Sequence, residues 1–76
     1  MKPTYSDGKT EARIGDVVTF NTVRGIVIGM DGTFVKVLLI GTSKETGETF
    51  VLPQRTVEEL PASKCHYLEK QVLNLF

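Results

Sequence analysis

Hydrophobic and polar residues alternate along the middle of the chain with the period of two that is typical of β-strands. Short polar or glycine-containing segments interrupt this alternation and mark turns. The pattern predicts five strands, at residues 17–20, 25–30, 33–40, 49–52 and 57–60. The first nine residues are polar, and a short strand at residues 10–13 would complete this lead-in. The sequence therefore predicts a mainly β protein.

The dipeptide Asp31-Gly32, between the second and third of these runs, is the strongest turn signal in the chain. A two-residue hairpin loop requires positive φ values, which glycine adopts freely and aspartate tolerates. The signal predicts that residues 25–30 and 33–40 form an antiparallel hairpin with Asp31-Gly32 as its loop.

The third predicted strand carries apolar side chains on both faces. Alternation places one set of residues toward the interior: Val35, Val37 and Leu39. It places the other set outward: Phe34, Lys36, Leu38 and Ile40. A strand with one face on the core normally has polar residues on the other. We therefore expect another segment, or another molecule, to cover the outer face.

The hydrophobic period changes after Pro61. Cys65, Leu68, Val72 and Leu75 follow one another at spacings of three, four and three, which predicts an amphipathic helix over residues 62–75. The alternative is a last strand at residues 65–68 after a turn at 61–63, and the sequence leaves both open. A docked helix would form either a lid on its own chain or a homodimer contact, and we expect the dimer. The residues of that contact would be Leu68, Val72, Leu75 and Phe76.

Length and composition limit the protein to one small domain. The chain has 76 residues, with nine Lys+Arg balanced by nine Asp+Glu. We divide it into a lead-in (1–13), a barrel (14–60) and the C-terminal helix (62–75). A single cysteine excludes an internal disulfide, and no apolar run approaches the roughly 18 residues of a membrane span. The N-terminus has no apolar signal region, so we expect a cytoplasmic protein without a membrane partner.

Residues with catalytic or metal-binding chemistry are few. Cys65 and His66 are neighbours, but adjacent side chains on a helix point about 100° apart and cannot form a dyad. Glu58 and Glu59 would point to opposite faces of a strand and cannot share a substrate atom. The glycines match no phosphate-binding fingerprint. We expect no catalytic residues, no cofactor and no metal, and therefore a protein that is not an enzyme.

Nucleic-acid binding by a small barrel requires a basic face, usually with stacking aromatic rings. Arg24, Lys36, Lys44 and Arg55 are the cations that would gather on one side with Phe34. The net charge of zero argues against it, because non-specific affinity comes mostly from contacts between cations and phosphates.

Two segments resemble the opening of an SH3-like barrel of the KOW or Tudor type. They are IGDVVTF at residues 14–20 and RGIVIG at 24–29. The segment VLPQRTVEEL at 51–60 is similar to the strand, 3₁₀ turn (54–56) and last strand that close such barrels. With the YSDG lead-in at 5–8, the chain also resembles small bacterial or phage-encoded barrel proteins of undefined activity. The resemblance covers residues 14–60 and implies a five-stranded SH3-like barrel there, to which the change of hydrophobic period adds a short C-terminal α-helix.

The plasmid-borne type II dihydrofolate reductases are also similar in length and barrel class. Their active surface carries Val-Gln-Ile-Tyr, whereas this chain has VEEL at residues 57–60. The exchange of amide for acid and the loss of the tyrosine argue against reductase activity.

The function expected from these features is protein binding through a rigid barrel face and its loops at 21–24 and 41–47. The protein would be a phage or mobile-element regulator or inhibitor that binds a host protein. The alternative is a KOW-like module that contacts RNA, DNA or a nucleic-acid machine. The expected partner-binding residues are Asn21, Arg24, Phe34, Lys36, Leu38, Ile40, Lys44 and Arg55.

Overall fold

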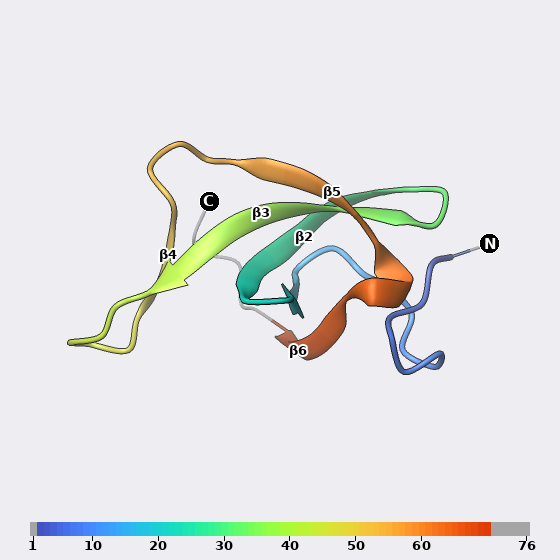
Figure 1. The fold of residues 1–76 in the computed structure, drawn as a ribbon, viewed down its shortest axis with the longest axis horizontal. Coiled ribbons are helices and arrows are strands. Elements are labelled where there is room, and N and C mark those ends of the chain that lie inside the picture. Colours follow the sequence, from blue (N-terminus) through green and yellow to red (C-terminus); the bar gives the residue numbers. More distant parts are fainter. Residues whose placement is uncertain (1, 71–76) are drawn as a thin grey trace.

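The computed structural model describes residues 2–70, which form six β-strands and one 3₁₀ turn (Figure 1). The elements follow in the order β1 (Asp16–Phe20), β2 (Val23–Asp31), β3 (Phe34–Thr42), β4 (Thr49–Val51), β5 (Val57–Pro61), η1 (Ala62–Lys64) and β6 (His66–Lys70). The prediction of a mainly β protein is confirmed. The five predicted strands correspond to β1–β5, and β6 is an additional strand.

All strand pairs are antiparallel and belong to one sheet of order β4-β3-β2-β1-β6. β5 also pairs with β3, so β4 and β5 share one edge of that strand. β5 follows β3 from Phe34 to Leu38, and β4 follows it from Ile40 to Thr42. Among residues 2–70 no pairing joins β6 to β4 or β5, and the sheet is not closed into a barrel.

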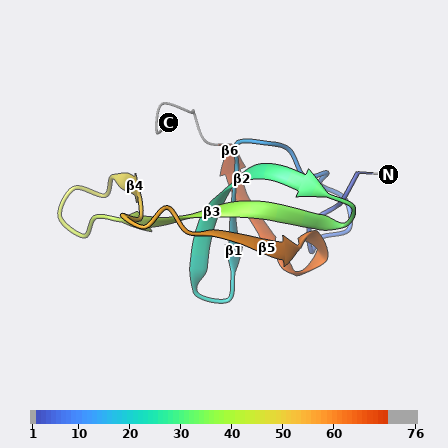
Figure 2. The ribbon, with the colours of Figure 1, turned by 90° about the horizontal axis from the view of Figure 1, so that it is seen from above.

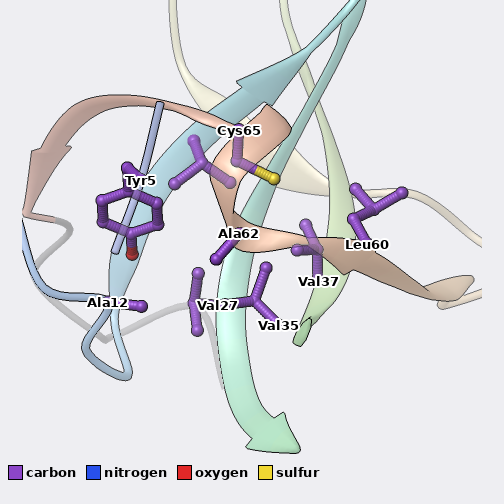
Figure 3. Close-up of a cluster of buried hydrophobic side chains, with 9 residues drawn as sticks. Tyr5, Ala12, Val27, Val35, Val37, Leu60, Ala62 and Cys65 are labelled. Carbon is purple, nitrogen blue, oxygen red and sulfur yellow. The ribbon is translucent and has the colours of Figure 1, made fainter. Parts of the chain in front are cut away.

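The inner face of the sheet carries the larger core cluster (Figure 3). Alternation places Val35 and Val37 of β3 there, with Leu39 packed against them, as the sequence predicts. The lead-in supplies Tyr5, whose side chain is 1% exposed and thus belongs to the core. The remaining members of the cluster are Ala12, Val18, Val27, Leu60, Ala62 and Cys65.

The outer face of β3 is also buried, as its apolar pattern indicates. Leu38 and Ile40 are 4% and 7% exposed, and Ile40 belongs to a second cluster with Val17 and Ile26. Phe34, on the same face but near the other end of β3, is 40% exposed. The residues expected to cover this face, Val72, Leu75 and Phe76, lie outside the described residues.

The helix predicted over 62–75 is wrong for the part that the structure describes. Residues 62–64 form η1, which Cys65 N closes on Ala62 O at 2.9 Å, and β6 pairs with the free edge of β1. Of the four apolar residues that predicted the amphipathic helix, only Cys65 and Leu68 lie in this part, and Leu68 is 45% exposed. Pairing with β1 satisfies the backbone of a segment too short to be a stable helix alone. The alternative of a turn followed by a last strand matches the structure.

The turn predicted at 54–56 is not a 3₁₀ helix. Arg55 has a φ of 49°, and its N–H donates to Leu52 O at 2.9 Å. This turn connects β4 to β5, which both lie on the same edge of β3. The 3₁₀ turn occurs instead between β5 and β6, where the chain crosses from β3 to β1.

The β2–β3 hairpin is confirmed, with its loop one residue later than predicted. Asp31 pairs with Phe34, so the two-residue loop is Gly32-Thr33. Gly32 has a φ of 63°, whereas neither Asp31 nor Thr33 has a positive φ. Glycine with positive φ at the first loop position is the pattern of a type II′ turn, which suits the twist of paired strands.

Replacing Gly32 with valine should lower the free energy of unfolding by about 1 kcal/mol or more, because a β-branched residue strongly disfavours positive φ. No atom lies within 4 Å of a Cβ built at Gly32, so the lost stability would come from backbone strain and not from a steric clash. Urea denaturation measures it. Gly32→Asn should lose less, because asparagine tolerates this conformation. Equal stability of the wild type and Gly32→Val would refute the role assigned to this residue.

Candidate functional site

The end of β3 and all of β4 form a two-stranded arm, residues 40–51, that extends beyond the rest of the sheet (Figure 2). Its loop is held by hydrogen bonds from Ser43 N to Glu48 O (2.8 Å) and from Gly47 N to Ser43 O (2.9 Å). Gly47 makes the reversal with a φ of 73°. The arm is therefore a hydrogen-bonded hairpin with a defined shape.

Gly41 lets two apolar side chains, Phe50 of the arm and Leu52 just after it, lie directly on the backbone of β3. A Cβ at this position would lie 2.8 Å from Phe50 Cζ and 3.4 Å from Leu52 Cδ2. Phe50 pairs with Gly41 across the strands and is 44% exposed. Glycine inside a strand often marks such a close approach.

A groove of about 540 Å³ lies between the arm and the β1–β2 turn. Three of its four aliphatic residues, Val23, Leu39 and Leu52, are half-buried, and the fourth, Ile40, is buried. Arg24, its one charged lining residue, is exposed and donates from Nη1 to Thr42 Oγ1 at 3.3 Å. We call this the arm groove, and its lining is Thr22, Val23, Arg24, Leu39, Ile40, Gly41, Thr42 and Leu52.

The side chains of the arm groove can make apolar and charged contacts with a bound molecule. Its residues present aliphatic side chains, threonine hydroxyls and one guanidinium. An apolar side chain of a partner fits such a lining, and a carboxylate beside it would pair with Arg24.

The predicted partner-binding residues divide into separate groups. Arg24 and Ile40 pair across β2 and β3 and both line the arm groove. Asn21 lies in the adjoining β1–β2 turn with a φ of 56°. Leu38 is buried, and Lys44 and Arg55 lie in the loops that precede and follow β4.

Phe34 and Lys36 lie in the first half of β3, away from the arm. Lys36 pairs across the strands with Glu59, whose charge opposes its own. The structure therefore does not gather the predicted cations on one face with Phe34.

The sequence places Val23 only within the expected binding loop at 21–24 and Leu39 only in the interior. The expected binding residues include neither Leu52 nor Phe50. These residues become neighbours only when β3 pairs with β2 and with β4, which brings together residues that are far apart in the sequence. The isolated glycine at position 41 was the one local signal of a close approach.

A second groove, of about 570 Å³, lies between the lead-in and β6. Its wall includes Asp16, which is 3% exposed and accepts hydrogen bonds from Tyr5 Oη (2.6 Å) and Arg13 N (2.9 Å). Lys70 Nζ lies 3.8 Å from the other carboxylate oxygen. We call this the lead-in groove, and its lining is Lys9, Thr10, Glu11, Arg13, Asp16, Tyr67 and Lys70.

Tyr5 is held as a protonated donor in this arrangement. Burial and the hydrogen bond to Asp16 together raise the pKa of Tyr5 far above its usual value. Its hydroxyl therefore keeps its proton and ties the lead-in to the start of β1.

The neighbours Cys65 and His66 have separate environments. Cys65 is buried, its thiol lies 3.5 Å from Pro61 O, and burial raises its pKa. His66 is exposed, with Nδ1 2.7 Å from Ser6 Oγ. Glu58 and Glu59 are both exposed, and no cluster of three His, Cys, Asp or Glu side chains suited to a metal ion occurs in residues 2–70.

The carboxylate of Asp7 organises the turn that leads to the lead-in groove. It accepts hydrogen bonds from Thr10 Oγ1 (2.6 Å), Lys9 N (2.8 Å) and Thr10 N (2.9 Å), and these bonds lower the pKa of Asp7 to about 2. Hydrogen bonds that favour the charged form act in this direction.

We expect the Asp7 carboxyl to titrate near pH 2 in the folded protein, as carboxyl NMR measures directly. Because its folded pKa lies below its ordinary value, its contribution to stability is present above about pH 4 and is lost as pH falls toward 2. In Asp7→Asn, which keeps an acceptor oxygen but cannot titrate, this part of the pH dependence should be absent. A wild-type carboxyl that titrates near its ordinary pKa would contradict the hydrogen-bonded turn.

No family model, curated protein sequence or solved structure matches this chain. Within residues 2–70, no helix has the length and apolar character needed to cross a membrane.

Proposed function

We propose that this protein is a non-enzymatic protein-interaction module whose binding face is the arm groove. The observation that carries the proposal is the aliphatic lining of this groove between the arm and the β1–β2 turn, both of which are held by the sheet. Loops on a rigid scaffold are where binding residues concentrate. The partner is a protein segment that presents an apolar side chain with a carboxylate next to it.

The energetics of Phe50 support this choice of surface. Its ring is 44% exposed beside the groove, although full burial of a phenylalanine side chain is favourable by about 1.5–3 kcal/mol. A partner that covers Phe50 and fills the groove recovers part of this free energy. Arg24 adds orientation, because a guanidinium forms directional hydrogen bonds with a carboxylate.

We place the fold in the SH3-like class. The order of β5, η1 and β6 supports this, since a strand, a 3₁₀ turn and a last strand close such barrels. Of these elements, η1 and β6 follow the segment 51–60 to which the resemblance assigns that order. The resemblance to phage-encoded barrel proteins favours one version of this function. In that version, a phage or mobile element encodes the protein as a regulator or inhibitor of a host protein.

Affinity capture from bacterial lysate with matched phenylalanine variants tests the proposal. Phe50→Ala should lose a captured protein that the wild type retains, and Arg24→Glu should weaken its capture by reversing the charge. Phe34→Ala is the control, because Phe34 is 40% exposed, similar to the 44% of Phe50, and lies outside the arm groove. If Phe34→Ala abolishes capture while Phe50→Ala does not, the binding face is not the arm groove.

The homodimer expected from the sequence is a separate proposal. Phe34, Leu68 and Val57 are exposed apolar residues outside the arm groove and supply surface for a second copy. Sedimentation equilibrium of the full chain gives its mass directly. A monomer mass would reject the dimer and leave the arm-groove proposal intact.

A further inference from the structure

The lead-in groove contains an aromatic ring on a fixed support. Tyr67 stacks on Tyr5, with ring centroids 5.8 Å apart and an angle of 23° between the planes. Tyr5 is 1% exposed and is anchored by its 2.6 Å hydrogen bond to Asp16. Tyr67 is 40% exposed, and it lines the groove.

Cationic side chains line the groove together with this ring. Lys9, Arg13 and Lys70 line the same groove and are exposed. Of the two carboxylates in the lining, Asp16 is buried, is bonded to Tyr5 and Arg13 N, and forms an ion pair with Lys70 at 3.8 Å. This leaves Lys9 and Arg13 as the cations without that pair, and Glu11 as the exposed carboxylate. The charge that faces solvent is therefore positive, although the whole chain is neutral.

The positions of two of these cations are set by the backbone. Lys9 N donates to Asp7 at 2.8 Å, and Arg13 N donates to Asp16 at 2.9 Å. Both residues line the groove, and their side chains are exposed. Lysine and arginine are the side chains with which proteins bind phosphate.

We propose that the lead-in groove binds a nucleotide, with the base stacked on Tyr67 and the phosphate held by Lys9 and Arg13. A planar base and a phosphate are the two parts of a nucleotide that such a lining suits, and stacking on an aromatic side chain beside cations is how proteins bind unpaired bases. The groove volume of about 570 Å³ lies in the range of small-molecule sites. The same chemistry is offered by a free nucleotide and by one unit of a single strand.

The test is a titration of the ¹⁵N-labelled full chain followed by amide NMR. The probes are adenosine monophosphate, adenosine, inorganic phosphate, phenyl phosphate and a short single-stranded DNA oligonucleotide. Adenosine monophosphate should shift amides of residues 9–13 and 66–70, and should bind more tightly than adenosine, phosphate or phenyl phosphate. Tighter binding of the oligonucleotide identifies a single strand as the ligand, and equal or weaker binding identifies the free nucleotide.

Variants separate the stacking from the charge. Tyr67→Leu should weaken binding at least about fivefold, within the range for loss of one stacked base, and Tyr67→Phe should retain it. The pair Lys9→Gln and Arg13→Gln should weaken binding and reduce its salt dependence. Lys44→Gln, on the arm, is the control and should change neither the affinity nor its salt dependence. If Tyr67→Leu fails to fold, the Lys9 and Arg13 variants still decide.

Three results would overturn the proposal. One is an absence of shifts in the groove with every probe. Another is phenyl phosphate binding as tightly as the nucleotide, which would assign the groove to aryl phosphates such as those on modified proteins. The third is an affinity that does not change when Lys9 and Arg13 are neutralised.

Discussion

Replacing Gly25 with alanine is expected to lower the free energy of unfolding by about 3 kcal/mol, at the upper end of the usual range for overpacking a core. Gly25 is buried in β2, between Val18 of β1 and Leu39 of β3. A Cβ at this position would collide with Val37 Cγ1 and would lie 2.9 Å from the backbone oxygen of Leu38. The strands on both sides are hydrogen-bonded to β2, so the backbone cannot move away without breaking pairs.

Urea denaturation of Gly25→Ala and Gly29→Ala isolates this effect. Gly29 lies on the same strand, but the nearest atom to its added Cβ would be Lys36 Cδ at 3.6 Å, an ordinary contact. Gly29→Ala should therefore remain within about 0.5 kcal/mol of the wild type. Similar losses in the two variants would mean that the packing of β2 against β3 is not as described.

Replacing Asp16 with alanine is expected to cost about 3 kcal/mol, because a buried donor left without its partner costs roughly 1–3 kcal/mol and Asp16 serves two donors. Its carboxylate accepts from Tyr5 Oη and Arg13 N and is 3% exposed. Without it, the buried Tyr5 hydroxyl has lost its acceptor and the lead-in has lost its attachment to β1.

A double-mutant cycle with Tyr5→Phe measures the coupling between Tyr5 and Asp16. Because Tyr5→Phe removes the orphaned hydroxyl, the double variant should be less destabilised than the sum of the two single variants. Asp31→Ala, at an exposed carboxylate in β2, is the control and should have little effect. Strict additivity of Asp16→Ala and Tyr5→Phe would show that their hydrogen bond does not hold the lead-in.

The strands and the hairpin could be predicted because period-two alternation is local. Val35 and Val37 were assigned to the core, and Leu38 and Ile40 to a second buried face, from spacing alone. The turn was displaced by one residue because glycine at position 32 is compatible with either the second place of one hairpin turn or the first place of another.

The C-terminal strand could not be predicted over the helix, because it depends on a contact with a segment far away in the sequence. The helical stripe depended mainly on Val72 and Leu75, outside the described residues, whereas β6 forms because β1 has a free edge. The burial of Tyr5 in the core could not be predicted from the sequence for a similar reason. It lies in a polar segment and becomes buried only where Asp16 provides an acceptor 11 residues away.

Part of the arm groove could be predicted from the sequence. Arg24 was identified because it belongs to a predicted loop, and Ile40 because it belongs to the apolar outer face of the third predicted strand; both line the arm groove. Val23 and Leu52 join them only after β3 has paired with β2 on one side and β4 on the other. No pattern in the sequence sets the length of the arm or the position of Phe50 over Gly41.

The most direct test of the arm groove as the binding face is an amide NMR titration of the full chain with the captured partner. The partner used is the protein that the wild type retains and Phe50→Ala loses. The proposal predicts that the largest shifts occur at residues 22–24, 39–42 and 50–52, which line or adjoin the arm groove. Largest shifts at Phe34 and Lys36, or at residues 9–13 of the lead-in groove, would contradict it.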